Sequence, residues 1–443
     1  MGAQMHHCVS ILGLWSLMGC VEIEPSQGPF GWSSGTGEPP DTTMSDASDF
    51  DEQPGDMPAR LDVSAGGAPA GQACTGVSSE TYAHIWIANS PQGTVSKIDT
   101  RTGAEQGRYY TGPSMGIDNP SRTSVGLAGD VVVANRLGSV VSVAADRERC
   151  IDRNGNGVIE TSGGATDVLR WGEDECVRWN SFLSTDADST HGPRPVGWDI
   201  GEGDDPCDVS DDRVWVGWFD HHTNTGRFER RDGTDGALLD EVSVEEWDAS
   251  RSSNFGPYGG AVDGDGNFWV LGLFGPIVKI DGQTLEVSRW EVPSGTSPYG
   301  LALDEDGHPW LAGYDGNVLH LDPELGWSEP ILVGDGRRLR GLQVDQEGQA
   351  WIAANDPCGV VMVDTKTSAL IYSQIELQDC REPVGVSVDI DGQVWLPDFG
   401  GNSVYRLDPD ELSTVRTVGL QGPYTYSDMT GAGLRLVAHQ PVG

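Results

Sequence analysis

Hydrophobic and polar positions alternate with period two in short stretches from about residue 80 to the end of the chain. Four segments nearly superpose: PYGGAVDGDGNFWVLG from Pro257, PYGLALDEDGHPWLAG from Pro298, LRGLQVDQEGQAWIAA from Leu339 and PVGVSVDIDGQVWLPD from Pro383. This alternation is typical of half-buried β-strands, and the Asp-Gly pairs between the stretches are typical of hairpin turns. The pattern therefore predicts repeated antiparallel hairpins.

The tryptophans of these segments recur at a nearly constant interval. They stand 41, 41 and 44 residues apart, at Trp269, Trp310, Trp351 and Trp395. Weaker copies at Trp86, Val132 and Trp215 bring the number of repeats to seven. Repeats of about 40–45 residues with four strands indicate β-propeller blades. We therefore predict an all-β chain whose residues 79–443 form a seven-bladed β-propeller.

The two ends of the repeat region complement each other. The first copy lacks an innermost strand before Trp86, whereas residues 424–437 remain after the seventh copy. We expect this C-terminal strand to complete blade one, because such closure removes exposed sheet edges.

The quoted segments resemble the NHL and virginiamycin B lyase-like superfamily of six- and seven-bladed propellers, whose blades carry the pattern P-x-G-[IVL]-x-x-D-x-x-G-x-[VIL]-W. The virginiamycin-type lyases resembled here use Mg²⁺ with a Glu-x-His pair and a further His near the central channel. This chain contains no Glu-x-His, and the matching stretch of its last blade carries Asp398 without an imidazole. The resemblance thus implies the fold more than the activity.

The net charge excludes one further class of function. The chain has 68 Asp and Glu against 27 Lys and Arg, a net charge of −41. Such an acidic surface repels phosphate backbones, so nucleic-acid binding is excluded. The turn aspartates repeated in each blade account for much of the excess, and we assign the D-x-D-G elements to turn chemistry rather than to metal binding.

The N-terminus predicts export. Residues 9–19 are apolar, and Leu17-Met18-Gly19-Cys20 resembles the lipobox of bacterial lipoproteins, which implies a signal peptide over 1–19 and lipidation of Cys20. No Lys or Arg precedes the apolar stretch, so an ordinary secretory signal or a misplaced start codon are the alternatives. Val21 favours the outer membrane by the same resemblance. Residues 20–78 are acidic and poor in apolar residues, which indicates a disordered linker.

Six cysteines follow the predicted lipidation site, as expected for disulfides in a secreted chain. Six allow fifteen connectivities. Proximity favours Cys150–Cys176 and Cys358–Cys380, which leaves Cys74–Cys207.

An insertion in blade two, residues 147–178, contains the sequence DRNGNGVIE. It fits the start of an EF-hand or dockerin-like calcium loop, with ligands from Asp152, Asn154, Asn156, the Val158 carbonyl and Glu160. Gly163 occupies the position of the usual bidentate acid, so Asp167 or one of Glu173, Asp174 and Glu175 has to replace it. The alternative is an Asn-Gly turn without an ion. We expect structural Ca²⁺ here.

Propellers commonly bind ligands at the channel mouth, through loops that precede the inner strands. The residues expected there are Arg122, Arg194, Tyr258, Tyr299, Arg340, Arg381 and Glu382. Arginines and aromatics in an acidic shell are reasonable ligand contacts; packing against neighbouring loops is the alternative. His221 and His222 are assigned to a surface loop. His308 stands in a turn position that Asn267, Gln349 and Gln393 occupy in sister blades, and we assign it a structural role.

These observations favour a monomeric, non-catalytic envelope lipoprotein, anchored to a membrane only through its lipid. Its propeller would be a calcium-stabilised platform for an envelope protein, a glycan or a small ligand. The leading alternative is a metal-dependent lyase or lactone-type hydrolase acting in the channel. A purely structural envelope component is the third possibility.

Overall fold

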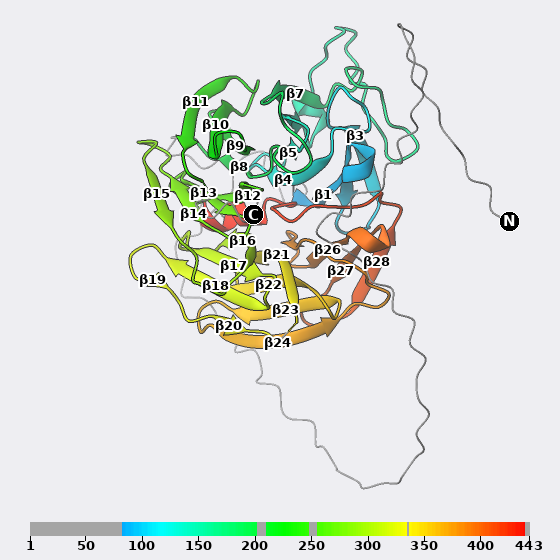
Figure 1. Ribbon diagram of the computed structural model, residues 1–443. Helices are drawn as coiled ribbons and strands as arrows, with labels where there is room; N and C mark the ends of the chain where they lie inside the picture. Colours follow the sequence, from blue (N-terminus) through cyan, green and yellow to red (C-terminus); the bar gives the residue numbers. More distant parts are fainter. Residues whose placement is uncertain (1–81, 202–209, 248–254, 335, 439–443) are drawn as a thin grey trace, which may run out of the picture. The chain divides into compact units, whose positions relative to one another are not determined.

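The computed structural model describes residues 82–201, 210–247, 255–334 and 336–438 of the chain. Within them the strands form seven antiparallel sheets around a common centre (Figure 1). The strands nearest the centre lie side by side in the order β1, β4, β8, β12, β16, β21 and β25. The fold is a seven-bladed β-propeller, as the repeats predict.

Each blade is a meander in which consecutive strands pair. Blades one to three contain β1 (His84–Asn89), β2 (Thr94–Asp99), β3 (Glu105–Tyr110); β4 (Pro120–Val125), β5 (Val131–Asn135), β6 (Ser139–Val143), β7 (Val177–Phe182); and β8 (Val196–Asp199), β9 (Arg213–Asp220), β10 (Thr225–Asp232), β11 (Leu238–Val244). Blades four and five contain β12 (Pro257–Val262), β13 (Phe268–Gly272), β14 (Ile277–Ile280), β15 (Val287–Trp290); and β16 (Pro298–Leu303), β17 (Pro309–Gly313), β18 (Asn317–Asp322), β19 (Gly326–Trp327), β20 (Ile331–Leu332).

Blades six and seven contain β21 (Arg338–Val344), β22 (Gln349–Asn355), β23 (Gly359–Asp364), β24 (Ala369–Glu376); and β25 (Ser387–Val388), β26 (Val394–Asp398), β27 (Ser403–Leu407), β28 (Thr414–Val418). The described residues also form three short 3₁₀ helices and one α-helix: η2 (Ser90–Gln92), η3 (Arg147–Arg149), η4 (Phe399–Gly401) and α1 (Ala432–Val437).

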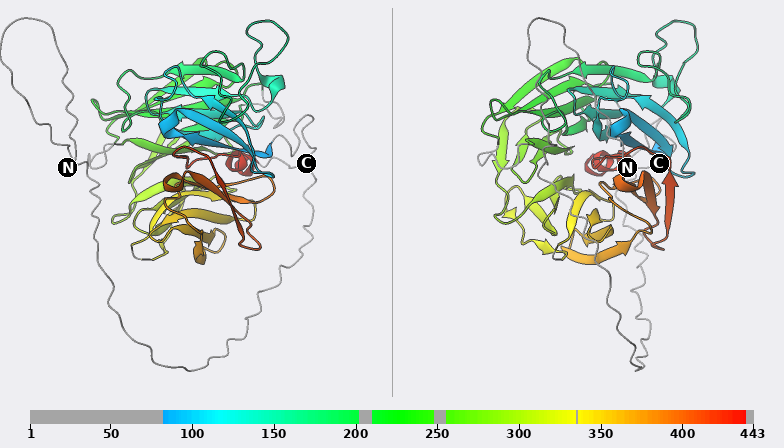
Figure 2. Two further views of the ribbon diagram at one scale, coloured as in Figure 1. Left: turned by 90° about the vertical axis from the view of Figure 1, so that its right-hand side faces the viewer. Right: turned by 45° about the vertical axis from the view of Figure 1, so that its right-hand side comes forward.

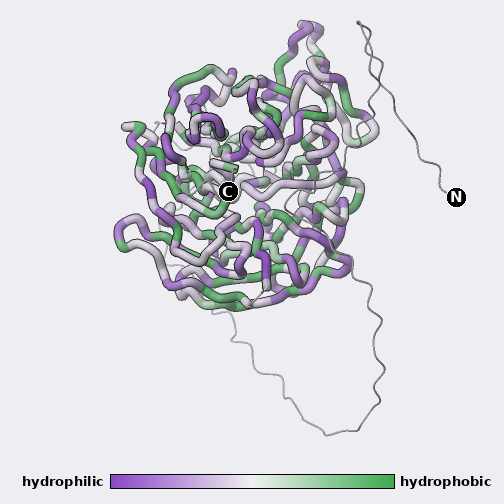
Figure 3. Tube along the Cα trace, in the orientation of Figure 1, coloured by the Kyte–Doolittle hydropathy of each residue, from purple (hydrophilic) through white to green (hydrophobic). Residues whose placement is uncertain are grey.

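The repeated tryptophans join neighbouring blades. Trp310 of blade five is 1% exposed and shares an apolar cluster with Leu342 and Val344 of blade six. Trp351 of blade six shares another with Val386 of blade seven. Apolar and polar stretches alternate around the ring (Figure 3), because each strand presents one set of side chains to these clusters. A single blade could not bury both faces, so the core exists only in the closed ring.

The hydrogen bonds of the first aspartate in the repeated turn explain why this turn accompanies the tryptophan. In blade seven, Asp389 Oδ2 accepts the indole N–H of Trp395 at 2.7 Å, and Oδ1 accepts the backbone N–H groups of Asp391 and Gln393. Gly392 has a φ of +79°, which favours glycine. Blades four, five and six repeat this arrangement at Asp263, Asp304 and Asp345. Turn chemistry is confirmed, and the indole contact adds to it.

The C-terminal segment closes the ring at blade one. The N–H of Tyr424 donates to the Ala88 carbonyl at 2.9 Å, and the N–H of Trp86 donates to the Met429 carbonyl at 2.9 Å. Between them, the Ala88 N–H donates to Thr425 Oγ1. Closure by a C-terminal segment beside β1 is therefore confirmed.

The second half of this segment differs from the predicted strand. Residues 432–437 form α1, which lies at the centre of the ring (Figure 2). The Asp428 carboxylate causes the change of direction, because it accepts the backbone N–H groups of Thr430, Gly431 and Leu434. Gly431 has a φ of +80°, which a strand does not allow.

Two disulfides, Cys150–Cys176 and Cys358–Cys380, match the pairs predicted from proximity. Disulfides persist in oxidising compartments, so these bonds fit an extracytoplasmic protein. The predicted Cys74–Cys207 bond, the lipidation site Cys20 and the linker up to residue 78 lie outside the described residues. Among the helices that the structure describes, none is long and apolar enough to span a membrane.

Candidate functional site

The predicted ligand residues come from loops and strand starts at one end of the ring. We call this end the mouth; β12 and β16 begin there. Pro257 pairs with Gly272 and Pro298 with Gly313, so the starts of the inner strands and the ends of the second strands share this end. Residues just before or at the start of each inner strand are therefore brought together.

Tyrosines fill the mouth. The rings of Tyr258 and Tyr299 meet edge to face with centroids 5.3 Å apart, and Tyr426 lies 4.9 Å from Tyr299. Tyr314 contacts Tyr299 from the other side at 4.8 Å. The hydroxyl oxygens of Tyr299 and Tyr424 are 2.9 Å apart, within hydrogen-bonding distance. We call this group of five side chains the tyrosine cluster.

Arginines are embedded in the tyrosine cluster. Arg122 is fully buried, stacks on Tyr426 and lies 4.9 Å from the Tyr258 ring centre. One of its nitrogens donates to the Ser121 carbonyl, whereas Nε and Nη2 have no hydrogen-bond partner. Arg194 is 2% exposed and lies 5.1 Å from the Tyr258 ring centre. An unpartnered guanidinium so deeply buried is costly and calls for an explanation.

Carboxylates are scarce around the tyrosine cluster. Arg340 donates to Glu382 Oε1 at 2.9 Å and to the Tyr299 hydroxyl at 3.3 Å. No carboxylate among the described residues forms an ion pair with Arg122, Arg136 or Arg194. The Arg194 guanidinium instead donates to carbonyls of the loop before β8. Arginines therefore outnumber carboxylates around the tyrosine cluster.

Burial and the neighbouring arginines shift pKa values in the tyrosine cluster. Burial lowers the pKa of Arg122 to about 9 and that of Arg194 to about 10. Burial raises the pKa of the Tyr424 phenol, but the guanidinium groups of Arg136, Arg122 and Arg340 outweigh it and hold that pKa at about 8. The lowered pKa of Tyr424 favours a negatively charged phenolate, and the lowered pKa values of the two arginines favour loss of a positive charge.

The structure places six of the seven predicted mouth residues in or against the tyrosine cluster: Arg122, Arg194, Tyr258, Tyr299, Arg340 and Glu382. Arg381 is exposed, and its backbone N–H faces Asp398. The sequence analysis missed Tyr424, Tyr426 and Arg136. The first two belong to the closing segment, whose predicted place beside β1 could have assigned them to the mouth.

Exposed apolar side chains surround the mouth. Met115 and Ile117, 46% and 67% exposed, lie on the loop before β4, and Leu137 lies on the turn between β5 and β6. Phe274, 41% exposed, lies on the loop between β13 and β14. These loops share the mouth end, so apolar surface borders the charged site.

The cavity in the channel beneath the mouth is small. A cavity of about 40 Å³ lies between the inner strands and α1, with polar groups from Ser124, Gln343 and Asp428 in its wall. This space holds one or two water molecules. This cavity is therefore too small for an organic ligand.

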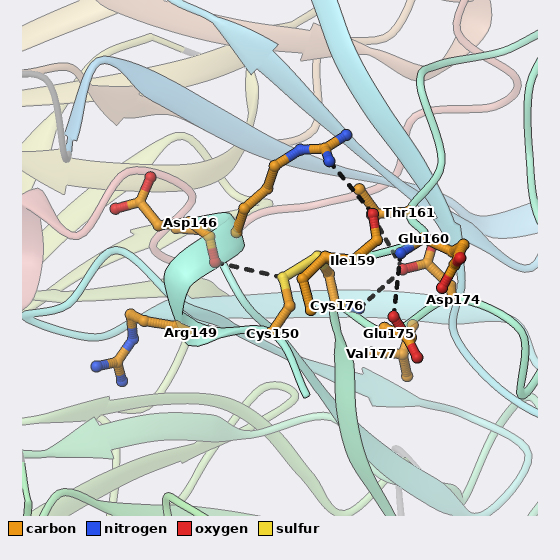
Figure 4. The surroundings of a disulfide bond; sticks show 12 residues. Asp146, Arg149, Cys150, Ile159, Glu160, Thr161, Asp174, Glu175, Cys176 and Val177 are labelled. Atoms are coloured by element: carbon orange, nitrogen blue, oxygen red, sulfur yellow. Dashed lines mark hydrogen bonds between the residues drawn. A yellow bond between two sulfur atoms is a disulfide. The ribbon is translucent and has the colours of Figure 1, made fainter. Parts of the chain in front are cut away.

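The predicted calcium loop is closed by its own polar groups. The Asp152 carboxylate accepts the N–H groups of Gly155, Asn156 and Gly157, and the Asn154 and Asn156 amides donate to Glu160. Glu175, 3% exposed, accepts the N–H groups of Arg153 and Glu160 beside the Cys150–Cys176 bond (Figure 4). Glu175 thus organises the loop from its buried side.

Histidines are absent from the tyrosine cluster. His221 and His222 follow β9 and are exposed, and His221 stacks on His191 with centroids 4.0 Å apart. In the described part of the chain, one group of three or more His, Cys, Asp or Glu side chains has its ligand atoms within 4.8 Å of one another, and it lies in blade five. The tyrosine cluster thus offers arginines and phenols but no imidazole.

No family model matches the chain, and a search of curated proteins finds no match. Among solved structures, virginiamycin B lyase from Staphylococcus aureus is similar at 12% identity and a TM-score of 0.49, over 70% of this chain and 89% of that one. Apo AztD from Citrobacter koseri is similar at 11% identity and a TM-score of 0.45, over 77% and 96%. A streptogramin B lyase is similar at 16% identity and a TM-score of 0.42, over 54% and 74%. Propeller folds host many functions, so the chemistry has to come from the site's own residues.

Proposed function

We propose that the protein is a non-catalytic binding protein of the cell envelope, anchored through Cys20, whose mouth binds an anionic ligand. Arg122 carries the proposal: it is fully buried, two of its nitrogens lack partners, and no described carboxylate neutralises it. A carboxylate, phosphate or sulfate group would supply charge-assisted hydrogen bonds to such a guanidinium. The ligand is thus a small molecule or polymer segment bearing an acidic group.

The surroundings of Arg122 define the rest of the ligand. The partly exposed rings of Tyr314 and Tyr424 offer apolar faces with polar hydroxyls, which suit an aromatic or sugar-like body. The apolar border at Met115, Ile117 and Phe274 extends the contact area beyond the charge. Because the protein carries a net charge of −41, the local positive field also selects where an anion can approach.

The test compares phenyl phosphate, which combines an anion with a ring, with neutral phenol. Phenyl phosphate is expected to bind, measured by calorimetry, and Arg122→Met to weaken binding by about 10-fold or more, because a charged hydrogen bond contributes about 1.5–3 kcal/mol. Arg122→Met should also raise the melting temperature, since an unpaired buried cation is replaced by an apolar side chain. The exposed Arg381→Met is the matched control and should change neither.

The titration of the Tyr424 phenol tests the same electrostatic environment. We expect a phenol titration near pH 8 in the ultraviolet difference spectrum, and its loss in Tyr424→Phe. Bound phenyl phosphate should raise this midpoint, because a nearby anion disfavours the phenolate. Phenyl phosphate that binds equally well to Arg122→Met, or that leaves the Tyr424 midpoint unchanged, would contradict the proposal.

Tyr424 also supports the second candidate function. A phenol with a pKa of about 8, hydrogen-bonded to Tyr299 and surrounded by arginines, has the properties of a general base in an elimination reaction. This would be a lyase without the His ligands that the resemblance implies. Turnover of a bound anion that Tyr424→Phe abolishes while binding persists would favour the enzyme over the binding protein.

We propose calcium as a structural ion in the loop from Asp152 to Glu160. Chelation is expected to lower the melting temperature or to speed tryptic cleavage at Arg153, and calcium should reverse either effect, because an ion that binds only the folded state stabilises it by about 2.7 kcal/mol at one hundred times its Kd. Asp152→Ala should remove the response, whereas Glu148→Ala is the control for a nearby exposed acid. Identical melting and cleavage with and without calcium would exclude the ion.

A further inference from the structure

A group of titratable side chains lies in blade five, away from the mouth. Asp304 follows β16, His308 precedes β17, and His320 lies on β18. Their ligand atoms all lie within 4.8 Å of one another, and His320 Nε2 is 3.6 Å from Asp304 Oδ2. Because β16 begins at the mouth and ends before Asp304, this group belongs to the opposite end of the ring.

Sister blades build the same turn without imidazoles. The His308 position is occupied by an amide and the His320 position by a cation or methionine: Asn267, Gln349 and Gln393 for the first, and Lys279, Met362 and Arg406 for the second. The Asp–Trp hydrogen bond persists in all of these blades. The two histidines are therefore not needed for the fold, and a structural role for His308 does not account for its pairing with His320.

Packing holds the group in place. The His320 ring stacks on Trp310 with centroids 4.7 Å apart, and its buried Nε2 has no hydrogen-bond partner. Asp304 is held by the Trp310 indole at 3.0 Å and the His308 N–H at 2.9 Å. Asp304 Oδ2 and His320 Nε2 therefore face each other at 3.6 Å.

We propose that Asp304, His308 and His320 bind a zinc ion, with a fourth position open to water. Two imidazoles and one carboxylate are a ligand set that zinc takes up readily and calcium does not. Zinc bonds of about 2.0–2.2 Å at tetrahedral angles separate ligand atoms by roughly 3.3–3.6 Å, which matches the His320–Asp304 separation. A small rotation of the partly buried His308 would complete the set.

The bound ion would connect the turn between β16 and β17 to β18. All three side chains are only partly buried, so the ion can exchange with solvent and its open position can accept a further ligand. This second site is independent of anion binding at the mouth, because it lies at the other end of the ring.

The test is zinc binding to the full chain purified without a polyhistidine tag. Calorimetry is expected to show a site that His308→Gln and His320→Lys each weaken at least 10-fold. These substitutions install side chains that sister blades carry, so the metal-free melting temperature should stay close to wild type. Asp304 is left unchanged, because its loss would break the turn and the indole contact. Cobalt should give the intense visible absorption of a four-coordinate ion in wild type only.

The surface histidines provide the control. His221→Gln removes the partner of His191 and should leave zinc affinity and the cobalt spectrum unchanged. Equal zinc affinity in wild type, His308→Gln and His320→Lys would overturn the proposal, and so would loss of binding in His221→Gln alone. Calcium at the same concentration should not displace zinc from the blade-five site.

Discussion

Deletion of residues 423–443 is expected to leave no stable propeller. The segment covers β1 with main-chain hydrogen bonds from Tyr424 to Met429, so its loss exposes a sheet edge at blade one. It also buries Tyr426, Met429, Leu434, Leu436 and Val437, each at most 7% exposed. Five such side chains contribute about 8–15 kcal/mol, comparable with the whole stability of a typical domain.

The measurement is soluble yield together with thermal unfolding followed by circular dichroism. Deletion of residues 439–443 alone is the matched control and should behave as wild type, because these residues follow α1 and its C-cap at Ala438. A chain ending at residue 422 that is soluble and melts cooperatively would show that the ring does not depend on the closing segment.

The fold could be predicted because each blade repeats the same local pattern. A period of 41 to 44 residues, a turn aspartate and a buried tryptophan recur in PYGLALDEDGHPWLAG and its copies. A blade whose pattern is weak can then be assigned by comparison with the other blades. The closing segment occurs once, and here prediction was only partly right. Its first half lies beside β1 as expected, whereas Asp428 and Gly431 turn its second half into α1.

The mouth could be predicted as a place but not as a chemistry. Loops before inner strands must converge, so Arg122, Arg194 and Tyr258 could be named from their positions. The sequence could not show that Arg122 is buried without a neighbouring carboxylate. That depends on which side chains of seven separate loops reach the tyrosine cluster. Arg381 was predicted at the mouth together with its neighbour Glu382. Neighbouring residues of an extended segment point in opposite directions, so the Arg381 side chain is exposed instead.

The blade-five group depended on a contact that no local pattern shows. His308 stands in a turn and His320 on the third strand, and only the strand register places His320 opposite Trp310. Reading each blade position by position across the repeats would have revealed that both substitutions occur in one blade. The calcium loop is the opposite case. The spacing of its expected ligand residues is visible in the sequence, whereas calcium binding is tested only by adding or removing the ion.

Replacement of Trp395 by alanine is expected to lower the free energy of unfolding by about 3–5 kcal/mol. The side chain is 1% exposed in the core between blades seven and one, where it shares a cluster with Ile85 and Val404. Trp395→Phe keeps most of this apolar contact but leaves Asp389 Oδ2 without the indole N–H. It should cost about 1–3 kcal/mol, the penalty of an unsatisfied buried acceptor.

Urea unfolding of Trp395→Phe alone and in an Asp389→Ala background separates the two contributions. Without its acceptor the indole N–H stabilises nothing, so the cost of Trp395→Phe should be much smaller in the Asp389→Ala chain than in wild type. Trp327→Phe is the control: its indole also donates a hydrogen bond, here to the Glu291 backbone carbonyl, but at a half-buried outer position. Additive costs for Asp389 and Trp395, or equal costs for Trp327→Phe and Trp395→Phe, would show that the repeated Asp–Trp bond does not stabilise the blade.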